Sequence, residues 1–362
     1  MNKYFPEIKK NFGFGCMRFP TVEGKVDVPV VKQMVDTFLE AGFHYFDTAY
    51  FYHEGNSERV LKEVLTSRYP RESYILTDKL AFNSFEKAED VPSVVEGQLE
   101  KCGVSYFDFY FYHAQNAQRH EAYKEKGIYE VGKELLAQGK FRHLGMSFHD
   151  SAQVLDQILT EHPEIEVVQL QLNYVDWIDP KVQSRDCWEV CRKHGKPVMV
   201  MEPVKGGSLA NLPQEAVEKL TGGSPASYAL RFAASCEDVI MVLSGMSNLE
   251  HVLDNIRTMK DFKPLSAEER ELIAQVRTIY QGQNKIPCTA CRYCTDDCPA
   301  GLDIPALFAC FNDKQQKVEG AQERYAAFET KADACVGCGH CESVCPQHLQ
   351  IRRLLKDVSQ AF

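Results

Sequence analysis

Residues 43–65 read FHYFDTAYFYHEGNSERVLKEVL, a short aromatic run followed by a helical pattern. FHYFDT has the composition of a buried strand, and Asn56 and Ser57 then open the amphipathic segment ERVLKEVL as helix-capping residues do. A strand followed directly by a helix is part of a βαβ unit, from which parallel sheets are built. The stretch therefore predicts an α/β fold.

The same alternation of strand and helix patterns extends over the first 282 residues. The eight predicted strands are FGFGCM (12–17), FHYFDT (43–48), SYILTD (73–78), FDFYFY (107–112), FRHLGMS (141–147), EVVQLQL (166–172), PVMVM (197–201) and DVIMVLS (238–244). Eight such units predict a (β/α)8 TIM barrel. An open doubly wound sheet competes with it. That fold usually carries a glycine-rich dinucleotide loop after its first strand, and GFG at 13–15 is too short for one.

The C-terminal part repeats a cysteine pattern. CTACRYCTDDCP (288–299) and CVGCGHCESVCP (335–346) both follow C-x2-C-x2-C-x3-C-P. In this pattern three thiolates hold one cluster, and the fourth cysteine, followed by proline, ligates the other cluster. We therefore predict two [4Fe-4S] clusters. One would be held by Cys288, Cys291, Cys294 and Cys345, and the other by Cys335, Cys338, Cys341 and Cys298.

Two tetrahedral zinc sites are the alternative interpretation, but they normally need only two close cysteine pairs each. The spacing resembles that of bacterial two-cluster ferredoxins, whereas the intervening residues 304–334 read as helices. We predict a barrel at residues 1–282 and a small, mainly α-helical dicluster ferredoxin-like domain at residues 283–362. Cys310, in the apolar part of the intervening segment, is predicted to be a core residue.

Composition narrows the classes of function. Of the 362 residues 44% are hydrophobic, and 41 Lys and Arg face 51 Asp and Glu. This mild acidity argues against a nucleic-acid or anionic-membrane partner. No apolar run approaches the roughly 18 residues of a membrane helix, and MNKYFPEIKK lacks the apolar region of a signal peptide. We expect a cytoplasmic protein, because a reducing compartment suits cysteines that bind metal.

Polar side chains follow several of the predicted strands, at the end where a (β/α)8 barrel carries its active site. They are Asp47, Tyr52, Lys79, His113, Ser147 and Asn173. Taken singly, each is more often a satisfied structural group, and an Asp–Lys pair is more often a structural ion pair. Taken as an ordered set, they favour catalysis.

Asp47-x4-Tyr52, with Lys79 and His113 at the next two strand ends, resembles the catalytic tetrad of the aldo/keto reductases. FDTAYFYHEGNSERVLKEVL, TDKL, GMSFHD, QLNY and SGMSN match that family's motifs in order, over nearly all of residues 1–260. The resemblance implies NAD(P)H-dependent reduction of a small carbonyl compound, an aldehyde or ketone, to an alcohol.

The chemistry of this reaction agrees with the four residues. The carbonyl oxygen must receive a proton, and a phenol of pKa about 10 is a reluctant donor unless a neighbour stabilises its anion. Lys79 can do this for Tyr52 while Asp47 keeps Lys79 charged, and His113 would orient the carbonyl oxygen. Tyr50 should lie outside this relay, because the family spacing selects Tyr52.

The resemblance also implies a nicotinamide site, with the carboxamide near Ser147 and Asn173 and with Gln169 or Gln171 close by. The segment 244–255 would bind the phosphates at a helix N-terminus. Taken alone, its SGMSN is better interpreted as a capped helix after a strand. The predicted cofactor contacts are Ser147, Gln169, Asn173, Met201, Ser244, Gly245, Met246, Ser247, His251, Asp254 and Asn255.

The sequence departs from the family pattern at two positions near the predicted cofactor. Met201 or Glu202 stands where many members carry an aromatic side chain that stacks on the nicotinamide. His251 stands where an arginine often binds the 2′-phosphate of NADP. The choice between NADP and NAD therefore stays open.

We expect a helix at about 248–259 to run down the barrel wall and a second at 266–280 to run back up. The cysteine domain would then cap the substrate pocket. Its walls would include aromatic residues, which suggests a partly apolar carbonyl substrate; they are Phe51, Phe82, Phe148 and Trp177. The remaining cysteines are predicted to be buried or incidental: Cys16, Cys102, Cys187, Cys191 and Cys236.

Three functions compete. We favour a carbonyl reductase whose clusters are structural or regulatory. The first alternative is an electron-transfer oxidoreductase that couples the clusters to nicotinamide or substrate, in which case a redox partner protein is also expected. A hydride carries two electrons whereas a cubane accepts one, and the sequence shows no flavin fingerprint to divide the pair. The third is a nucleotide-sensing barrel, against which the intact set of four residues weighs.

Overall fold

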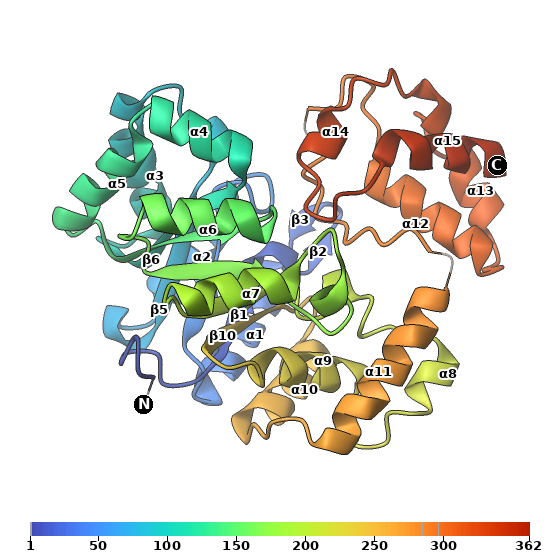
Figure 1. Ribbon diagram of the computed structural model, residues 1–362, viewed down its shortest axis with the longest axis horizontal. Coiled ribbons are helices and arrows are strands. Elements are labelled where there is room, and N and C mark those ends of the chain that lie inside the picture. The colour runs from blue at the N-terminus through green and yellow to red at the C-terminus, as the bar shows by residue number, and fades with distance from the viewer. Residues whose placement is uncertain (1, 284, 296) are drawn as a thin grey trace.

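The computed structural model describes residues 2–283, 285–295 and 297–362, and its larger part is a closed barrel of parallel strands (Figure 1). The barrel strands are β1 (Phe12–Gly15), β4 (Tyr45–Asp47), β5 (Ile75–Leu80), β6 (Phe107–Gln115), β7 (Phe141–Phe148), β8 (Val167–Gln171), β9 (Val198–Met201) and β10 (Val239–Gly245). Each pairs with its neighbours in chain order, and β1 closes the barrel between β4 and β10. All eight predicted strands and the predicted (β/α)8 architecture are confirmed.

Helices surround the strands, as Figure 1 shows. They are α1 (Val28–Glu40), α2 (Ser57–Leu61), α3 (Val91–Cys102), α4 (Ala117–Glu125), α5 (Ile128–Ala137), α6 (Ala152–Glu161), α7 (Ser184–Lys193), α8 (Gln214–Val217), α9 (Pro225–Ala234) and α10 (Leu249–Lys260). Several begin at a side chain that accepts a hydrogen bond from the first turn, such as Asp27 before α1 and Asn248 before α10. Asn56 precedes α2 as predicted, although its side chain makes no capping hydrogen bond there.

A short antiparallel hairpin, β2 (Thr21–Val22) and β3 (Lys25–Val26), follows β1 and was not predicted. Its two-residue turn uses Glu23 and Gly24, both with positive φ, at 50° and 78°. Such turns match the twist of a hairpin. Two residues per strand are too few for a hydrophobic period to reveal them.

Apolar side chains fill the interior of the barrel, so that the site can lie only at an end of it. Phe109, Phe111, Met199 and Met241 are fully buried there. The packing also explains a strand glycine: a Cβ on Gly145 would lie 2.6 Å from the Phe111 ring.

The C-terminal part is helical, as predicted from the intervening segment between the cysteine repeats. It follows α11 (Ala267–Gly282) and contains α12 (Ile304–Gln315), α13 (Ala321–Ala326), α14 (His340–Ser343) and α15 (Ile351–Ala361). Its own core includes Leu307, Phe308 and Leu355. Cys310 belongs to that core with 4% exposure, and its thiol donates to the Ala321 carbonyl oxygen at 3.0 Å, which confirms it as a core residue.

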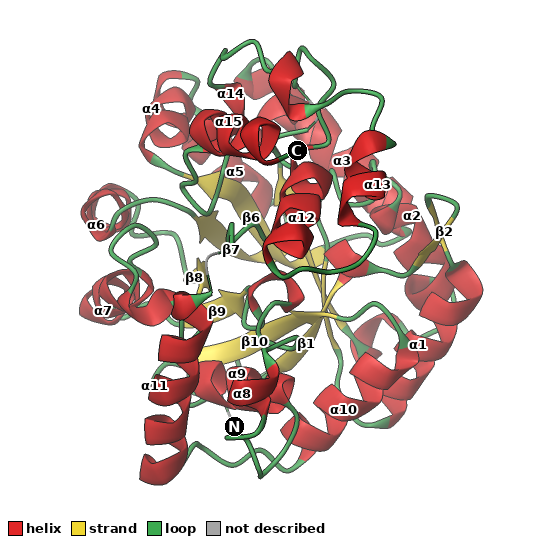
Figure 2. Ribbon diagram, turned by 90° about the vertical axis from the view of Figure 1, so that its right-hand side faces the viewer, coloured by secondary structure: helices red, strands yellow, loops and turns green. Residues whose placement is uncertain are grey.

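Helix α11 connects the two parts along the outside of the barrel, and its start is fixed by a capping box between Ser266 and Glu269. Its far end leads to the C-terminal domain, which lies in front of the barrel strands in Figure 2. Helices α10 and α11 thus confirm the two predicted helices that follow the last strand. No helix in the described part of the chain is long and apolar enough to span a membrane.

Candidate active site

Asp47 and Lys79 form a buried ion pair at the carboxyl ends of the paired strands β4 and β5. The Lys79 ammonium donates to Asp47 Oδ1 at 2.5 Å and to the Thr48 carbonyl oxygen at 2.7 Å, and the lysine is wholly inaccessible to solvent. Burial raises the pKa of Asp47, and the Lys79 charge opposes this rise. Each buried charge is therefore neutralised by the other: the Asp47 carboxylate by Lys79, and the Lys79 ammonium by Asp47.

Tyr52 and His113 lie beside this pair. The Lys79 Nζ is 5.1 Å from the centroid of the Tyr52 ring, and the rings of Tyr52 and His113 meet edge to face at 6.2 Å. Burial raises the pKa of Tyr52 well above its usual value, and the Asp47 charge adds to the rise. Burial lowers the pKa of His113 well below 6.5, so its imidazole is neutral at neutral pH. The four predicted residues, called the tetrad below, are thus brought together.

Tyr50 lies outside the tetrad. Its ring contacts Phe51 and faces the Lys101 ammonium at 4.3 Å from the ring centroid. Tyr50 also does not line the cavity described below, of which Tyr52 forms part of the wall.

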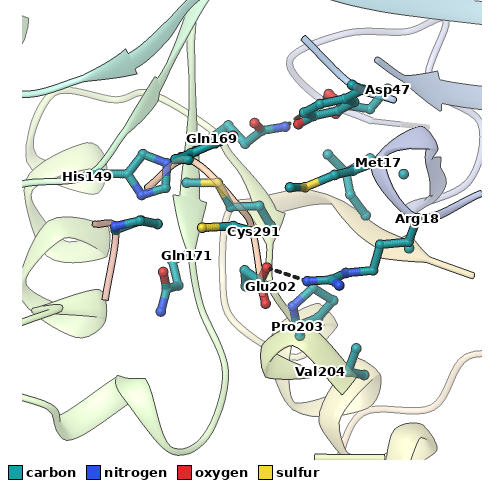
Figure 3. A pocket seen from close by; sticks show the side chains of 18 of the residues that line it. Met17, Arg18, Asp47, His149, Gln169, Gln171, Glu202, Pro203, Val204 and Cys291 are labelled. Carbon is teal, nitrogen blue, oxygen red and sulfur yellow. Dashed lines mark hydrogen bonds and ion pairs between the residues drawn. The ribbon is translucent and has the colours of Figure 1, made fainter. Parts of the chain in front are cut away.

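A cavity of about 90 Å³ lies at the tetrad, between the barrel and the C-terminal domain. Figure 3 shows it with Met17 and Arg18 on one side and His149 on the other. We call it the tetrad cavity, and its lining includes Asp47, Tyr52, Gln169, Met201, Glu202, Gly245, Cys291, Tyr293, Pro346 and Gln347. The C-terminal domain therefore caps the carboxyl ends of the strands. None of the four aromatic residues predicted as pocket walls lines this cavity: Phe148 is a core residue, Phe82 and Trp177 pack against the core, and Phe51 is exposed.

Tyr293 is a site residue that the sequence analysis missed. It stands between Cys291 and Cys294 in the cap, and its hydroxyl lies 3.3 Å from His113 Nε2. A hydrogen bond from Tyr293 also lowers the pKa of Tyr52, although burial outweighs it. The Tyr293 hydroxyl thus contacts both Tyr52 and His113, the two barrel residues that would bind a carbonyl oxygen. The only signal in the sequence was an aromatic residue inside the cysteine pattern.

Arg18 and Glu202 form a second polar pair in the tetrad cavity, drawn with a dashed line in Figure 3. Their charged atoms are 3.5 Å apart, and Arg18 also donates to the Thr289 carbonyl oxygen at 2.7 Å. Glu202 Oε2 has no partner among the described residues, and Glu202 has a positive φ of 54°. Burial raises the pKa of Glu202, against the effect of Arg18. An unpartnered buried carboxylate oxygen beside a cation indicates a site prepared for a polar ligand.

The predicted cofactor contacts fall into three groups. Gln169, Met201 and Gly245 line the tetrad cavity, and Gln169 also donates to Asp47 Oδ2 at 3.1 Å. Ser247 and His251 are exposed at the start of α10. That end of a helix, together with Arg18 packed over Gly245, fits the phosphates of a dinucleotide.

The other predicted contacts lie behind the cavity and bond to protein groups. Ser147 Oγ accepts from the Ala114 amide at 2.7 Å, and Asn173 donates to Asp176 at 2.6 Å. Asn255 donates to Ser244 Oγ at 3.0 Å. Asp254 accepts from Ser224 at 2.5 Å, and Met246 is fully buried.

A buried polar network joins the cap to the barrel. Gln347, two residues after Cys345, exchanges hydrogen bonds with Gln171 at 2.9 and 3.1 Å. The Lys205 ammonium donates to Gln347 at 3.0 Å and to Asp176 at 2.5 Å. Such satisfied buried groups fix the orientation of two surfaces. The sequence predicted that the cysteine domain caps the barrel, but not which side chains meet across the contact.

The eight repeat cysteines lie in the C-terminal domain, and their division between two clusters stays a prediction. Burial raises the pKa of the Cys294 thiol, and Cys291, Cys288 and Cys345 raise it further, which places these four sulfurs together. Another cavity is lined by Cys298, Cys335, Cys338 and Cys341, and Cys294 also borders it. A zinc ion with Zn–S bonds of about 2.3 Å would hold its sulfurs about 3.8 Å apart. No three thiols of the described chain lie within 4.8 Å of one another, so the arrangement fits a cluster better than a single zinc ion.

Comparison with known proteins shows the family to which the chain belongs. Residues 11–278 match the model of the aldo/keto reductase family, and residues 287–349 match that of a 4Fe-4S dicluster domain. The NADH-specific methylglyoxal reductase of Escherichia coli is 25% identical over 195 residues, which cover 48% of this chain and 57% of that enzyme. The 9,11-endoperoxide prostaglandin H2 reductase of Trypanosoma cruzi is 25% identical over 238 residues, or 65% of this chain and 78% of that one.

Solved structures share the barrel. An aldo-keto reductase from Bacillus halodurans in its holo form has a TM-score of 0.61 and 24% identity, covering 74% of this chain and 91% of that one. An aldo-keto reductase from Klebsiella pneumoniae in complex with NADPH has a TM-score of 0.60 and 18% identity, covering 75% and 90%. At these identities the likeness concerns the fold.

Proposed function

The chain belongs to the aldo/keto reductase family and is an NAD(P)H-dependent oxidoreductase that carries an iron–sulfur domain, and from this premise we propose that it reduces a carbonyl group on a small molecule to an alcohol. Tyr52 would donate the proton to the carbonyl oxygen, and His113 would orient that oxygen. The carbonyl compound is an aldehyde or ketone that enters the tetrad cavity under the cap.

The observation that carries this proposal is the position of Lys79 between Asp47 and Tyr52. A phenol whose pKa is raised by burial gives up its proton only if its anion is stabilised. The Lys79 ammonium, 5.1 Å from the Tyr52 ring centroid, supplies that stabilisation, and Asp47 at 2.5 Å holds the ammonium in place. Neutral His113 can donate a hydrogen bond to the carbonyl oxygen without adding a charge.

NADP or NAD is the cofactor in this proposal, and it supplies the hydride when bound. The α10 N-terminus and Arg18 would hold its phosphates, and Gln169 and Met201 would contact its nicotinamide end. Two [4Fe-4S] clusters are proposed for the cap, each on its predicted set of four cysteines. The effect of Cys288, Cys291 and Cys345 on the pKa of Cys294 supports the first set, and the cavity lined by Cys298, Cys335, Cys338 and Cys341 supports the second. We propose no nucleic-acid or membrane partner, and the cytoplasm stays the predicted compartment.

The test replaces Tyr52 by phenylalanine and uses Tyr50→Phe as the matched control. Oxidation of NADPH and of NADH would be followed anaerobically with a panel of aldehydes and ketones. We expect Tyr52→Phe to lower kcat about 10²–10⁴-fold, the usual contribution of a general acid, with the cofactor Kd within about twofold of wild type. Tyr50→Phe should behave as wild type. Full turnover by Tyr52→Phe would remove Tyr52 from the role of proton donor.

One observation favours a second candidate function. Cys291, a predicted cluster ligand, lines the tetrad cavity together with Tyr52 and Asp47. Electron transfer between the cap and a ligand in this cavity would then be short-range, which is the electron-transfer oxidoreductase of the sequence analysis. The measurement that separates the two functions closes the Discussion.

A further inference from the structure

A second cavity, of about 220 Å³, adjoins the tetrad cavity between the barrel and the cap. The two cavities share His149, Tyr293 and Pro346 in their linings. The barrel side of the second cavity also includes Arg119 and Asn116 at the start of α4, and we call it the Arg119 cavity. A substrate held at the tetrad could therefore extend into it.

Arg119 enters this cavity without an acidic partner among residues 2–283, 285–295 and 297–362. Its Nη1 donates to the carbonyl oxygens of Ala114 at 2.7 Å and His113 at 3.4 Å, and the guanidinium faces the Phe82 ring at 5.7 Å from its centroid. Burial lowers the pKa of Arg119, but a guanidinium stays charged in proteins. A half-buried arginine that forms no ion pair in the described part of the chain is suited to bind an anion.

Among the described residues, no acidic group of the cavity forms an ion pair with this guanidinium. Asp150 is the one acidic residue in the lining, and its carboxylate accepts from the amides of Ala117 at 2.9 Å and Ser151 at 2.7 Å. Burial lowers the pKa of His149 to about 3, so its ring is neutral at neutral pH and can donate one N–H. Because Asp150 and Cys345, a predicted cluster ligand, also line the cavity, the single unpaired guanidinium suits a singly charged carboxylate better than a doubly charged phosphate.

The position of the cavity assigns the anion to the substrate and not to the cofactor. Arg119 and His149 follow β6 and β7, whereas the predicted phosphate segment follows β10. In the order β1-β10-β9-β8-β7-β6-β5-β4, β6 is four strands from β10 in either direction. The tetrad therefore lies between the two sites, and Arg119 is anchored on the backbone of His113.

We infer that the substrate is an oxo acid, whose carboxylate binds Arg119 and His149 while its carbonyl oxygen lies at Tyr52 and His113. This inference rests on the proposed function. The carbonyl carbon receives a hydride from NAD(P)H and the oxygen receives a proton from Tyr52, so that the product is the corresponding hydroxy acid and the cofactor leaves oxidised.

The experiment compares each oxo acid with its own methyl ester. Phenylglyoxylate, 2-oxobutanoate and succinic semialdehyde would be tested beside their esters and beside glyceraldehyde 3-phosphate, with wild type, Arg119→Met, Arg119→Lys and Lys126→Met. Lys126 is the matched control, because its ammonium lies 5.6 Å from the centroid of the same Phe82 ring but it does not line the cavity.

We expect wild type to prefer at least one acid over its ester by about tenfold or more in kcat/KM, as a charge-assisted hydrogen bond provides. Arg119→Met should abolish that preference through KM, Arg119→Lys should restore part of it, and Lys126→Met should keep it. Equal use of acids and esters by wild type, or an equal loss for both in Arg119→Met, would overturn the inference and leave carbonyl reduction standing. A preference for the phosphate would overturn the carboxylate assignment.

A binding measurement separates failure of this inference from failure of the proposed function. Calorimetry with phenylglyoxylate and NADP⁺ on Tyr52→Phe requires no turnover. Binding that Arg119→Met weakens about tenfold supports the anion site even if no carbonyl compound is reduced. Binding that is indifferent to Arg119 contradicts it, whatever the enzyme reduces.

Discussion

At the scale of single residues, the buried Lys79–Asp47 pair determines what the site can do. Both charges are almost wholly buried, since Lys79 is 0% and Asp47 4% exposed. Each is held by the other at 2.5 Å, and Thr48 and Gln169 satisfy their remaining bonds. Such a pair contributes little to stability beyond an apolar replacement, yet removing one partner is strongly destabilising. The function of the Lys79–Asp47 pair is therefore to place a cation beside Tyr52.

Lys79→Met should therefore affect both stability and catalysis. It leaves Asp47 as a buried charge without its cation, and we expect a loss of about 3–5 kcal/mol in the free energy of unfolding. The loss of the ammonium beside Tyr52 should also lower kcat about 10²-fold or more. Anaerobic chemical denaturation and steady-state kinetics measure the two effects. Wild-type stability in Lys79→Met would contradict the description of the pair as mutually dependent.

The sequence predicted the tetrad because its members lie at strand ends and in a family order. It did not predict Tyr293, Arg18 or Arg119. Tyr293 is 180 positions from His113, and the contact between them exists only because the cap folds over the barrel. The proposed role of Arg119 depends on a cavity lined by both domains, and no local sequence pattern can predict such a cavity.

At the scale of elements, the segment from Cys288 to Cys294 connects the cysteine chemistry to the barrel. Its Cys291 lines the tetrad cavity, its Tyr293 contacts His113, and the carbonyl group of its Thr289 accepts from Arg18 at 2.7 Å. A cysteine loop is shaped by the group that it ligates. The placement of Tyr293 should therefore depend on the integrity of this part of the cap.

Tyr293→Phe tests whether this loop contributes to the reaction. The change removes one hydroxyl beside His113 and keeps the ring, so we expect kcat/KM to fall about fivefold to tenfold, the effect of about 1 kcal/mol. The cofactor Kd should stay at the wild-type value. Tyr325→Phe is the control, because that hydroxyl accepts from the Ala332 amide inside the cap and does not line the tetrad cavity. Equal kinetics for the two variants would exclude a contribution of Tyr293.

The sequence identified these elements with uneven success. Strands and long helices were predicted because eight apolar runs alternate with amphipathic segments. The β2–β3 hairpin escaped because two-residue strands carry no period. The predicted domain boundary between residues 282 and 283 falls at the end of α11, whose last residue is Gly282. That the two parts are separate folding domains stays a prediction.

At the scale of the whole molecule, the cap closes one end of a barrel whose interior is filled with side chains. The contact is close enough for backbone to meet backbone. Gly206, in the loop after β9, has a φ of 64°, and a Cβ there would lie 2.7 Å from Thr289 Cα and the Thr289 carbonyl oxygen. This close approach, together with the Gln171–Gln347 pair, holds the cap over the tetrad.

Gly206→Ala should loosen the cap more than backbone strain alone would. Gly127→Ala is the matched control, because Gly127 also has a positive φ, 71°, but has no atom within 4 Å of its Cβ position. We expect the control to lose about 1–2 kcal/mol from strain, and Gly206→Ala to lose more and to become sensitive to proteolysis near residues 281–285. Anaerobic thermal unfolding and limited proteolysis measure this. Equal losses of stability in Gly206→Ala and Gly127→Ala would mean that Thr289 shifts to make room for the new Cβ without disturbing the cap.

The central claim is that the capped tetrad reduces a carbonyl compound, and one anaerobic measurement tests it most directly. NADPH and then NADH would be added to the iron-loaded protein, first alone and then with carbonyl compounds, while nicotinamide absorbance and the EPR spectrum are followed together. The account predicts that nicotinamide is consumed only when a carbonyl compound is supplied and that Tyr52→Phe prevents this. Nicotinamide oxidation without any carbonyl compound, with EPR signals of reduced clusters growing in step, would contradict it.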